Sequence, residues 1–234
     1  MEVIDLPLVY KNGLAATRLI NELYEKFKPK EFDDVKIMYL HAHGPGFIHT
    51  RRPVNKLEDL KGMKIRSTGV TAKLVTALGG TPVAMPMGET YDAINRGVAD
   101  GTVAPYEALE QWKLGEVVKY TIETYASSYS AAGFVVMNKN RWNSLPPDIQ
   151  KIIESLNKEW IDPTGKLWDA IDKSGREFTL KLGNKIITLS KKEEEKWAKA
   201  ARPVLDDYVK YAKGKGVPGD EALKFCLDRL KKLQ

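Results

Sequence analysis

The stretch that decides the fold is GMKIRSTGVTAKLVTALGGTPVAMPMGETYDAINRGVADGTVAPY, residues 62–106. Short apolar segments alternate along it with helical segments, and glycine or proline stands at the joints. The pattern predicts three strands and two helices, in the order strand 63–67, helix 68–78, strand 82–85, helix 88–96 and strand 98–104. Gly79 and Gly97 are placed to end the two helices. Strands and helices alternating at this pace are typical of an α/β fold with a mainly parallel sheet.

Arg66 is the first candidate functional residue. In a parallel sheet, ligands bind beyond the carboxyl ends of the strands, and Arg66, Met87 and residues 104–106 all fall at such ends. Arg66 follows an otherwise apolar strand and precedes Ser67 and Thr68, at the start of a helix whose dipole favours an anion. From these residues alone, a structural salt bridge or a surface arginine stays open as the alternative.

Composition limits the classes of protein. The chain has 234 residues, of which 43% are hydrophobic, enough for one large domain or two small lobes with a core. No apolar run is long enough to span a bilayer. The net charge is +6, but lysines alternate with acids, as in residues 191–196, so we expect a solvated surface and no nucleic-acid partner. Cys226 is the only cysteine, which excludes an internal disulfide.

The rest of the chain reads mainly as helices. A face of Leu19, Ile20 and Leu23 predicts a helix over 12–28 that ends at Pro29. A long helical tract runs from 146 to about 182, with an interruption and a kink expected near Pro163. Further helices are predicted from 190 to about 213 and over the last residues of the chain. There is no internal repeat and no low-complexity segment.

Motifs for catalysis and for cofactors are absent. The chain contains no G-x-S-x-G, no Walker loop, no G-x-G-x-x-G and no H-E-x-x-H sequence. His41 and His43 have a spacing that places both rings on one face of a strand, but no third zinc ligand accompanies them. We therefore expect no enzyme activity, no cofactor and no metal.

The central stretch also carries a family resemblance. The ordered motifs are LEDLKGMKIR (57–66), LGGTP (78–82), ETYDAI (89–94), GVADG (97–101) and NKNRWNSLPP (138–147). Together they resemble the substrate-binding proteins of TRAP (tripartite ATP-independent periplasmic) transporters, the DctP-like family, over nearly the whole chain. The resemblance implies an α/β fold of the two-lobed periplasmic-binding-protein type with a long interlobe helix. It also implies capture of a small organic acid in the periplasm for membrane permease subunits.

The resemblance further implies how the chain divides. We expect lobe I from 1–43 plus 132–171, lobe II from 44–131 plus 172–213, and a C-terminal helix at 214–234. Family members carry a segment before Met1, including the signal peptide and the first strands of one lobe. We interpret the first lobe as incomplete. An incomplete lobe predicts exposed apolar surface and self-association, or loss of binding, around the residues Val3, Ile4, Leu6 and Leu8.

Binding residues also come from the resemblance. In the family, the arginine matching Arg66 pairs with a carboxylate, because a guanidinium presents a rigid fork of donors. Relatives often have asparagine where Ala104 stands, and some have a further arginine near Phe47, so this pocket is predicted to be less polar and to suit a monocarboxylate with an apolar or aromatic body. The predicted ligand-binding residues are Arg66, Ser67, Thr68, Met87, Ala104, Pro105, Tyr106, His43, Phe47 and Ser128.

The sequence is also compatible with other interpretations. Met87 equally fits core filling, and Tyr106 equally fits helix packing. A ligand-sensing module for a signalling partner would share the same fold. So would an α/β enzyme that uses Arg66 to hold a substrate carboxylate.

Overall fold

A computed structural model describes all residues, 1–234, and contains nine α-helices and eight strands. The helices are α1 (Gly13–Phe27), α2 (Gly69–Ala77), α3 (Met87–Asn95), α4 (Glu107–Gln111), α5 (Leu114–Val117), α6 (Lys139–Asn143), α7 (Pro147–Lys181), α8 (Lys191–Gly214) and α9 (Gly219–Leu233). The strands are β1 (Val35–Ala42), β2 (Phe47–Thr50), β3 (Lys64–Arg66), β4 (Thr81–Val83), β5 (Gly101–Ala104), β6 (Tyr120–Glu123), β7 (Ala132–Asn138) and β8 (Lys185–Thr188). Short 3-10 helices lie at η1 (Glu2–Asp5), η2 (Lys30–Phe32), η3 (Leu57–Leu60) and η4 (Tyr125–Ser127).

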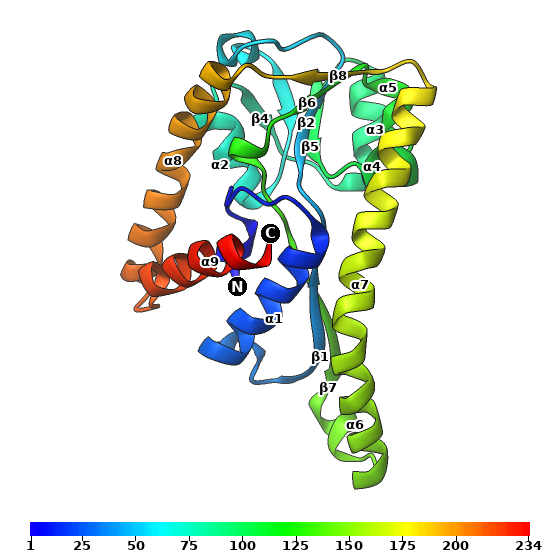
Figure 1. Ribbon diagram of the computed structural model, residues 1–234, viewed down its shortest axis with the longest axis vertical. Coiled ribbons are helices and arrows are strands. Elements are labelled where there is room, and N and C mark those ends of the chain that lie inside the picture. The colour runs from blue at the N-terminus through cyan, green and yellow to red at the C-terminus, as the bar shows by residue number, and fades with distance from the viewer.

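The strands form two separate sheets. One has six strands in the order β4-β3-β5-β2-β6-β8, and the other is the antiparallel pair β1-β7. In the larger sheet β3 runs parallel to β4 and β5, and β6 runs parallel to β8, whereas β2 is antiparallel to both of its neighbours. The chain therefore passes from β1 into the larger sheet at β2, leaves it after β6 to form β7, and returns to it at β8 after α7. Helices pack beside both sheets (Figure 1).

The central stretch folds as its pattern predicts. Its three strands are β3, β4 and β5, its two helices are α2 and α3, and the three strands are mutually parallel neighbours. Gly79 and Gly97 follow the helices with φ of +90° and +75°, in the left-handed region that a residue with a Cβ rarely adopts. The predicted strands are each one to three residues too long, and among the extra residues Met63 and Ala99 are apolar and buried although they lie outside the strands.

The N-terminal residues are buried, so the exposed apolar surface expected there is wrong. Val3, Ile4, Leu6 and Leu8 are at most 2% exposed and belong to one core cluster with α1, α8 and α9. The Tyr10 hydroxyl donates to the Ile4 carbonyl oxygen at 2.7 Å inside this cluster. The segment is sandwiched between helices from both ends of the chain, which hides its apolar side chains. The expected self-association therefore gains no support from these four residues.

Helix α7 connects the two sheet-bearing parts of the molecule. It runs along one side, past β1 and β7 at one end and beside α4 and α5 at the other (Figure 1). The interruption expected at Pro163 is absent, and the helix continues to Lys181. Pro163 is exposed, so the carbonyl that its missing N–H leaves unpaired faces water. Glycines allow close approach: Gly165 packs on Leu14 of α1, and Gly175 packs on the Tyr106 backbone.

Candidate functional site

A cavity of about 330 Å³ opens at the carboxyl ends of β3 and β5. Six separate parts of the chain supply its walls: the end of η1, the link after β1, the β3–α2 junction, the first residue of α3, the stretch from β5 to the start of α4, and residues 129–131. Its polar groups include Asp5, His43, Arg66 and Glu107. This is the place where ligands bind in sheets of this kind.

Arg66 is the one basic side chain in the wall of this cavity. It is the last residue of β3, and only 7% of it is exposed. Its Nε and Nη2 groups donate to the Met85 carbonyl oxygen at 3.1 and 3.0 Å, which fixes the guanidinium plane. No ion pair in the structure includes Arg66. Burial lowers the pKa of Arg66, as expected for a cation without a counter-ion.

The first turn of α2 adds uncharged donors beside Arg66. Thr68, Gly69, Val70 and Thr71 all line the cavity. Thr71 Oγ1 donates to the Thr68 carbonyl and accepts from the Thr68 N–H, which closes this end of the helix. No hydrogen bond within the chain engages the N–H groups of Gly69 and Val70. Free N–H groups at a helix N-terminus next to a cation form a site suited to a carboxylate.

Two acidic side chains and an uncharged histidine complete the polar wall. Burial raises the pKa of Asp5 to about 6 and also raises the pKa of Glu107. Burial lowers the pKa of His43 to about 4, so its ring is neutral at pH 7. His43 Nδ1 lies 2.5 Å from the Gly44 carbonyl oxygen, which only accepts, so Nδ1 carries the proton and Nε2 is an acceptor. His43 also packs edge-on against the Tyr129 ring, with centroids 5.4 Å apart.

The structure brings half of the ten predicted ligand-binding residues to this cavity. They are His43, Arg66, Thr68, Met87 and Pro105. Ser67, Ala104 and Ser128 are fully buried and lie outside its wall. The hydroxyl groups of Ser67 and Ser128 donate to backbone carbonyls, and the Ala104 carbonyl lies 3.0 Å from His49 Nε2.

Phe47 and Tyr106 lie in a neighbouring cavity of about 420 Å³, on the side of α7. Their rings are 5.4 Å apart in an edge-on arrangement. The Tyr106 hydroxyl donates to Glu123, which also pairs with Arg176 at 3.3 Å. The charges in this second cavity are thus already matched in part, which makes it a weaker candidate for binding an anion.

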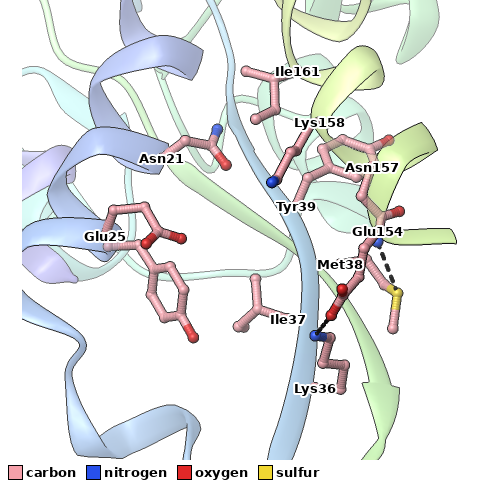
Figure 2. A pocket seen from close by; sticks show the side chains of 11 residues that line it. Asn21, Glu25, Lys36, Ile37, Met38, Tyr39, Glu154, Asn157, Lys158 and Ile161 are labelled. Carbon is pink, nitrogen blue, oxygen red and sulfur yellow. Dashed lines mark hydrogen bonds and ion pairs between the residues drawn. The ribbon is translucent and has the colours of Figure 1, made fainter. Parts of the chain in front are cut away.

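A third cavity, of about 460 Å³, is larger than the one beside Arg66 and lies between α1, β1 and α7. Figure 2 shows its two internal contacts. Lys36 Nζ pairs with Glu154 at 2.5 Å, and the Asn157 amide lies 3.2 Å from the Met38 sulfur. Its wall holds two lysines, Lys36 and Lys158, and two glutamates, Glu25 and Glu154, and Lys158 is exposed to water. Size alone therefore does not favour this cavity, and we place the candidate site at the buried, unpaired Arg66.

No group of three or more His, Cys, Asp or Glu side chains is arranged to hold a metal ion. His41 instead accepts from Trp168 Nε1 at 3.1 Å and stacks on its ring. None of the helices combines the length and the apolar character that crossing a membrane requires.

Sequence reasoning missed Asp5 and Glu107 as components of the cavity, and Tyr129, which the resemblance places near the cleft or the hinge, was not among the predicted ligand-binding residues. Glu107 lies two residues after Pro105, so its place just beyond the end of β5 was a usable indication. Nothing in the sequence around Asp5 connects it with Arg66, because η1 reaches the cavity only through the packing of the N-terminal segment on α1.

Comparison with known proteins gives the family. The family model described as bacterial extracellular solute-binding protein, family 7, matches residues 1–211. A curated relative, the C4-dicarboxylate-binding periplasmic protein of Rhodobacter capsulatus, is 26% identical over 212 residues, which cover 88% of this chain and 63% of the relative. The first curated relatives are longer than this chain, which spans 64%, 68% and 63% of their lengths.

Solved structures agree with this result. A marine metagenome TRAP solute-binding protein, described as specific for aromatic acid ligands, was solved with metahydroxyphenylacetate. It has a TM-score of 0.94 and 29% identity, and the match covers 100% of this chain and 75% of that one. A TRAP solute-binding protein from Rhodoferax ferrireducens, solved with copurified benzoate, has a TM-score of 0.90 and 29% identity, with 99% and 74% covered. The predicted α/β periplasmic-binding-protein fold is thereby confirmed.

Proposed function

The chain belongs to the bacterial extracellular solute-binding proteins of family 7, and from this premise we propose that it captures a small organic acid by its carboxylate for a TRAP transporter. The family consists of binding proteins rather than enzymes, so no chemistry on the ligand is expected. The acid would be passed to membrane permease subunits, and binding would occur in the periplasm, where the named Rhodobacter relative works.

One observation carries the proposal. Arg66 is a buried cation without a carboxylate partner, and it faces a cavity beside the free N–H groups of Gly69 and Val70. Leaving a buried charge unpaired is costly, and a bound carboxylate would remove that cost. The hydrogen bonds to Met85 orient the guanidinium before the ligand arrives, which lowers the entropy lost on binding.

The body of the acid would contact apolar groups. Met87, Val103 and Pro105 line the cavity together with the Tyr129 ring. Two solved relatives hold a benzoate and a hydroxyphenylacetate. We therefore expect an acid with one carboxylate and an apolar or aromatic body.

We propose further that the two sheet-bearing parts move as lobes, with the boundaries expected from the sequence at residues 43/44, 131/132 and 171/172. Neighbouring carboxylates on α7 support the last boundary. Asp169 Oδ1 accepts from Gly13 N at 2.6 Å, at the start of α1, whereas Asp172 Oδ1 accepts from Glu107 N at 2.9 Å, at the start of α4. A hinge between them would let the two parts close over the ligand.

The test is a thermal-shift screen of the chain against carboxylic acids. A ligand at a hundred times its Kd adds about 2.7 kcal/mol of stability, which corresponds to about 5 to 11 °C for a chain of this size. Arg66→Ala should abolish the shift. Arg96→Ala, which removes an exposed arginine at the end of α3, is the matched control and should keep it. A panel that gives no shift, or shifts that survive Arg66→Ala, would refute the proposal.

A further inference from the structure

The cavity beside Arg66 has more acidic than basic side chains. Asp5 reaches it from η1 and Glu107 from the first position of α4, so the two carboxyl groups come from unrelated elements. Asp5 Oδ1 accepts from Ala132 N at 3.1 Å, and the Glu107 carboxyl forms no hydrogen bond within the chain. No ion pair includes either of them. Both are therefore open to a cationic or hydrogen-bond-donating partner.

The surroundings of Tyr129 indicate that Arg66, Asp5 and Glu107 line the same cavity. It is 5% exposed, lines the cavity, and its hydroxyl forms no hydrogen bond within the chain. Burial and the charges of Asp5 and Glu107 raise the pKa of Tyr129, while Arg66 acts to lower it. Burial lowers the pKa of Arg66, and the charge of Tyr129 acts to raise it. The cation and the two carboxyl groups thus share a cavity without neutralising one another.

The charge balance discriminates between classes of acid. With Arg66 protonated, both carboxyl groups ionised and His43 neutral, the wall carries one net negative charge. A plain monocarboxylate adds to that charge, and a dicarboxylate adds twice as much, whereas a zwitterion adds none. A second carboxylate on the ligand would also face Asp5 or Glu107 in a partly dehydrated space, where like charges repel strongly.

We propose that this site prefers a zwitterionic amino acid, whose carboxylate pairs with Arg66 while its ammonium group faces Asp5 and Glu107. The inference rests on the proposed function and narrows its substrate class. An ammonium group offers three donors, and the wall supplies acceptors for them in the two carboxylates and in His43 Nε2. A plain acid would leave those acceptors without a partner.

The experiment compares four probes that share one skeleton. Phenylacetate, mandelate, phenylglycine and phenylmalonate differ only in the α substituent, which is hydrogen, hydroxyl, ammonium or carboxylate. Calorimetric titration of the full chain gives a Kd for each. Unit charges about 6 Å apart at an effective dielectric constant of 20 change an affinity roughly a hundredfold. We expect phenylglycine to bind at least about tenfold more tightly than phenylacetate, and phenylmalonate to bind most weakly.

Charge-removing variants identify the responsible groups. Glu107→Gln and Asp5→Asn should each weaken phenylglycine binding and strengthen phenylacetate binding, since both remove a negative charge. The asparagine oxygen still accepts from Ala132 N, so the fold of η1 is kept. Glu221→Gln, at an exposed position of α9, makes the same change in net charge far from the cavity and should move neither affinity.

The pH dependence gives an independent readout. Burial raises the pKa of Asp5 to about 6, and the charges near it are the N-terminal amino group, Glu2, Tyr10 and Tyr129. Asp172 and Tyr129 are the titratable groups near Glu107. As the pH falls from 7.5 to 5, Asp5 takes up a proton. Phenylglycine should then bind more weakly and phenylacetate more tightly, and Asp5→Asn should flatten both trends.

The outcomes separate the two proposals. Phenylacetate binding as tightly as phenylglycine, in an Arg66-dependent manner, would overturn the zwitterion inference and leave carboxylate capture standing. Equal binding of phenylmalonate would do the same. Failure of all four probes and of the wider acid panel would overturn both proposals.

Discussion

Replacing Gly175 with alanine tests the packing of α7 on α4, which positions Glu107. A Cβ at Gly175 would stand 2.1 Å from the Tyr106 carbonyl oxygen and 2.6 Å from its carbonyl carbon. Ordinary contact begins at 3.4 Å, so the two helices must separate by about 1.3 Å, the difference between 3.4 and 2.1. The obstacle is backbone, which cannot rotate away as a side chain would.

The expected loss follows from two opposing effects. Overpacking costs about 1–3 kcal/mol, and we expect the upper end because the clash is with backbone. Alanine returns about 1 kcal/mol of helix propensity relative to glycine. The net destabilisation is about 2 kcal/mol, or a melting temperature about 4 to 8 °C lower for a chain of this size.

The assay is thermal and urea unfolding, followed by circular dichroism. Gly214→Ala, at the last residue of α8, is the matched control, because no atom lies within 4 Å of its added Cβ. This variant gains helix propensity without a clash and should be slightly more stable than the parent. Gly175→Ala with a stability equal to or above the parent would refute the close contact between α7 and α4.

Four further predictions concern stability and reactivity. Burial raises the pKa of Asp172 from 3.8 to about 7, so its contribution to folding stability is complete below pH 3.8 and is lost as the pH rises through 7. Asp172→Asn should therefore reduce the gain in unfolding free energy that the parent shows on going from pH 8 to pH 5. An unaltered gain would contradict this. Val9 is 41% exposed and has a φ of +66°, a strained backbone conformation for a β-branched residue. Val9→Gly should raise the melting temperature, because it relieves about 1–2 kcal/mol of strain, partly offset by the greater backbone entropy of glycine in the unfolded chain. A lower melting temperature than that of the parent would count against the strain. Ile4 is fully buried, so Ile4→Ala should cost about 2–5 kcal/mol in urea unfolding; a loss below 1 kcal/mol would mean that the N-terminal segment is not packed. Burial raises the pKa of the Cys226 thiol to about 12, so an alkylating reagent should modify it only in denaturant, and rapid native labelling would disprove its burial.

The local features of the chain could be predicted because short-range physics sets them. The helix stops at Gly79 and Gly97 need left-handed backbone, and both glycines adopt it. The apolar face of α1 repeats at helical spacing, and the observed helix ends one residue inside each predicted end. Pro163 failed as a helix breaker because its environment, an exposed position on α7, is a tertiary property.

The candidate site was only half predictable for the same reason. Arg66 could be found because it ends a strand in a βα pattern, and chain order alone places such a residue at the ligand edge of a parallel sheet. Phe47 and Tyr106 were assigned with it, yet they line the cavity on the side of α7. Their positions in the sequence did not indicate whether the Phe47 and Tyr106 rings would line the cavity beside Arg66 or the one beside α7.

The sequence by itself therefore determined the α/β alternation, the parallel run of β3, β4 and β5, and a cation at its carboxyl edge, because backbone preferences and hydrophobic periodicity act over a few residues. The tertiary structure decided that Asp5 and Tyr129 line the cavity beside that cation together with Glu107. Their placement depends on strand order and on the burial of the N-terminal segment among α1, α8 and α9. These are long-range contacts, chosen by the packing of the whole core rather than by any local pattern.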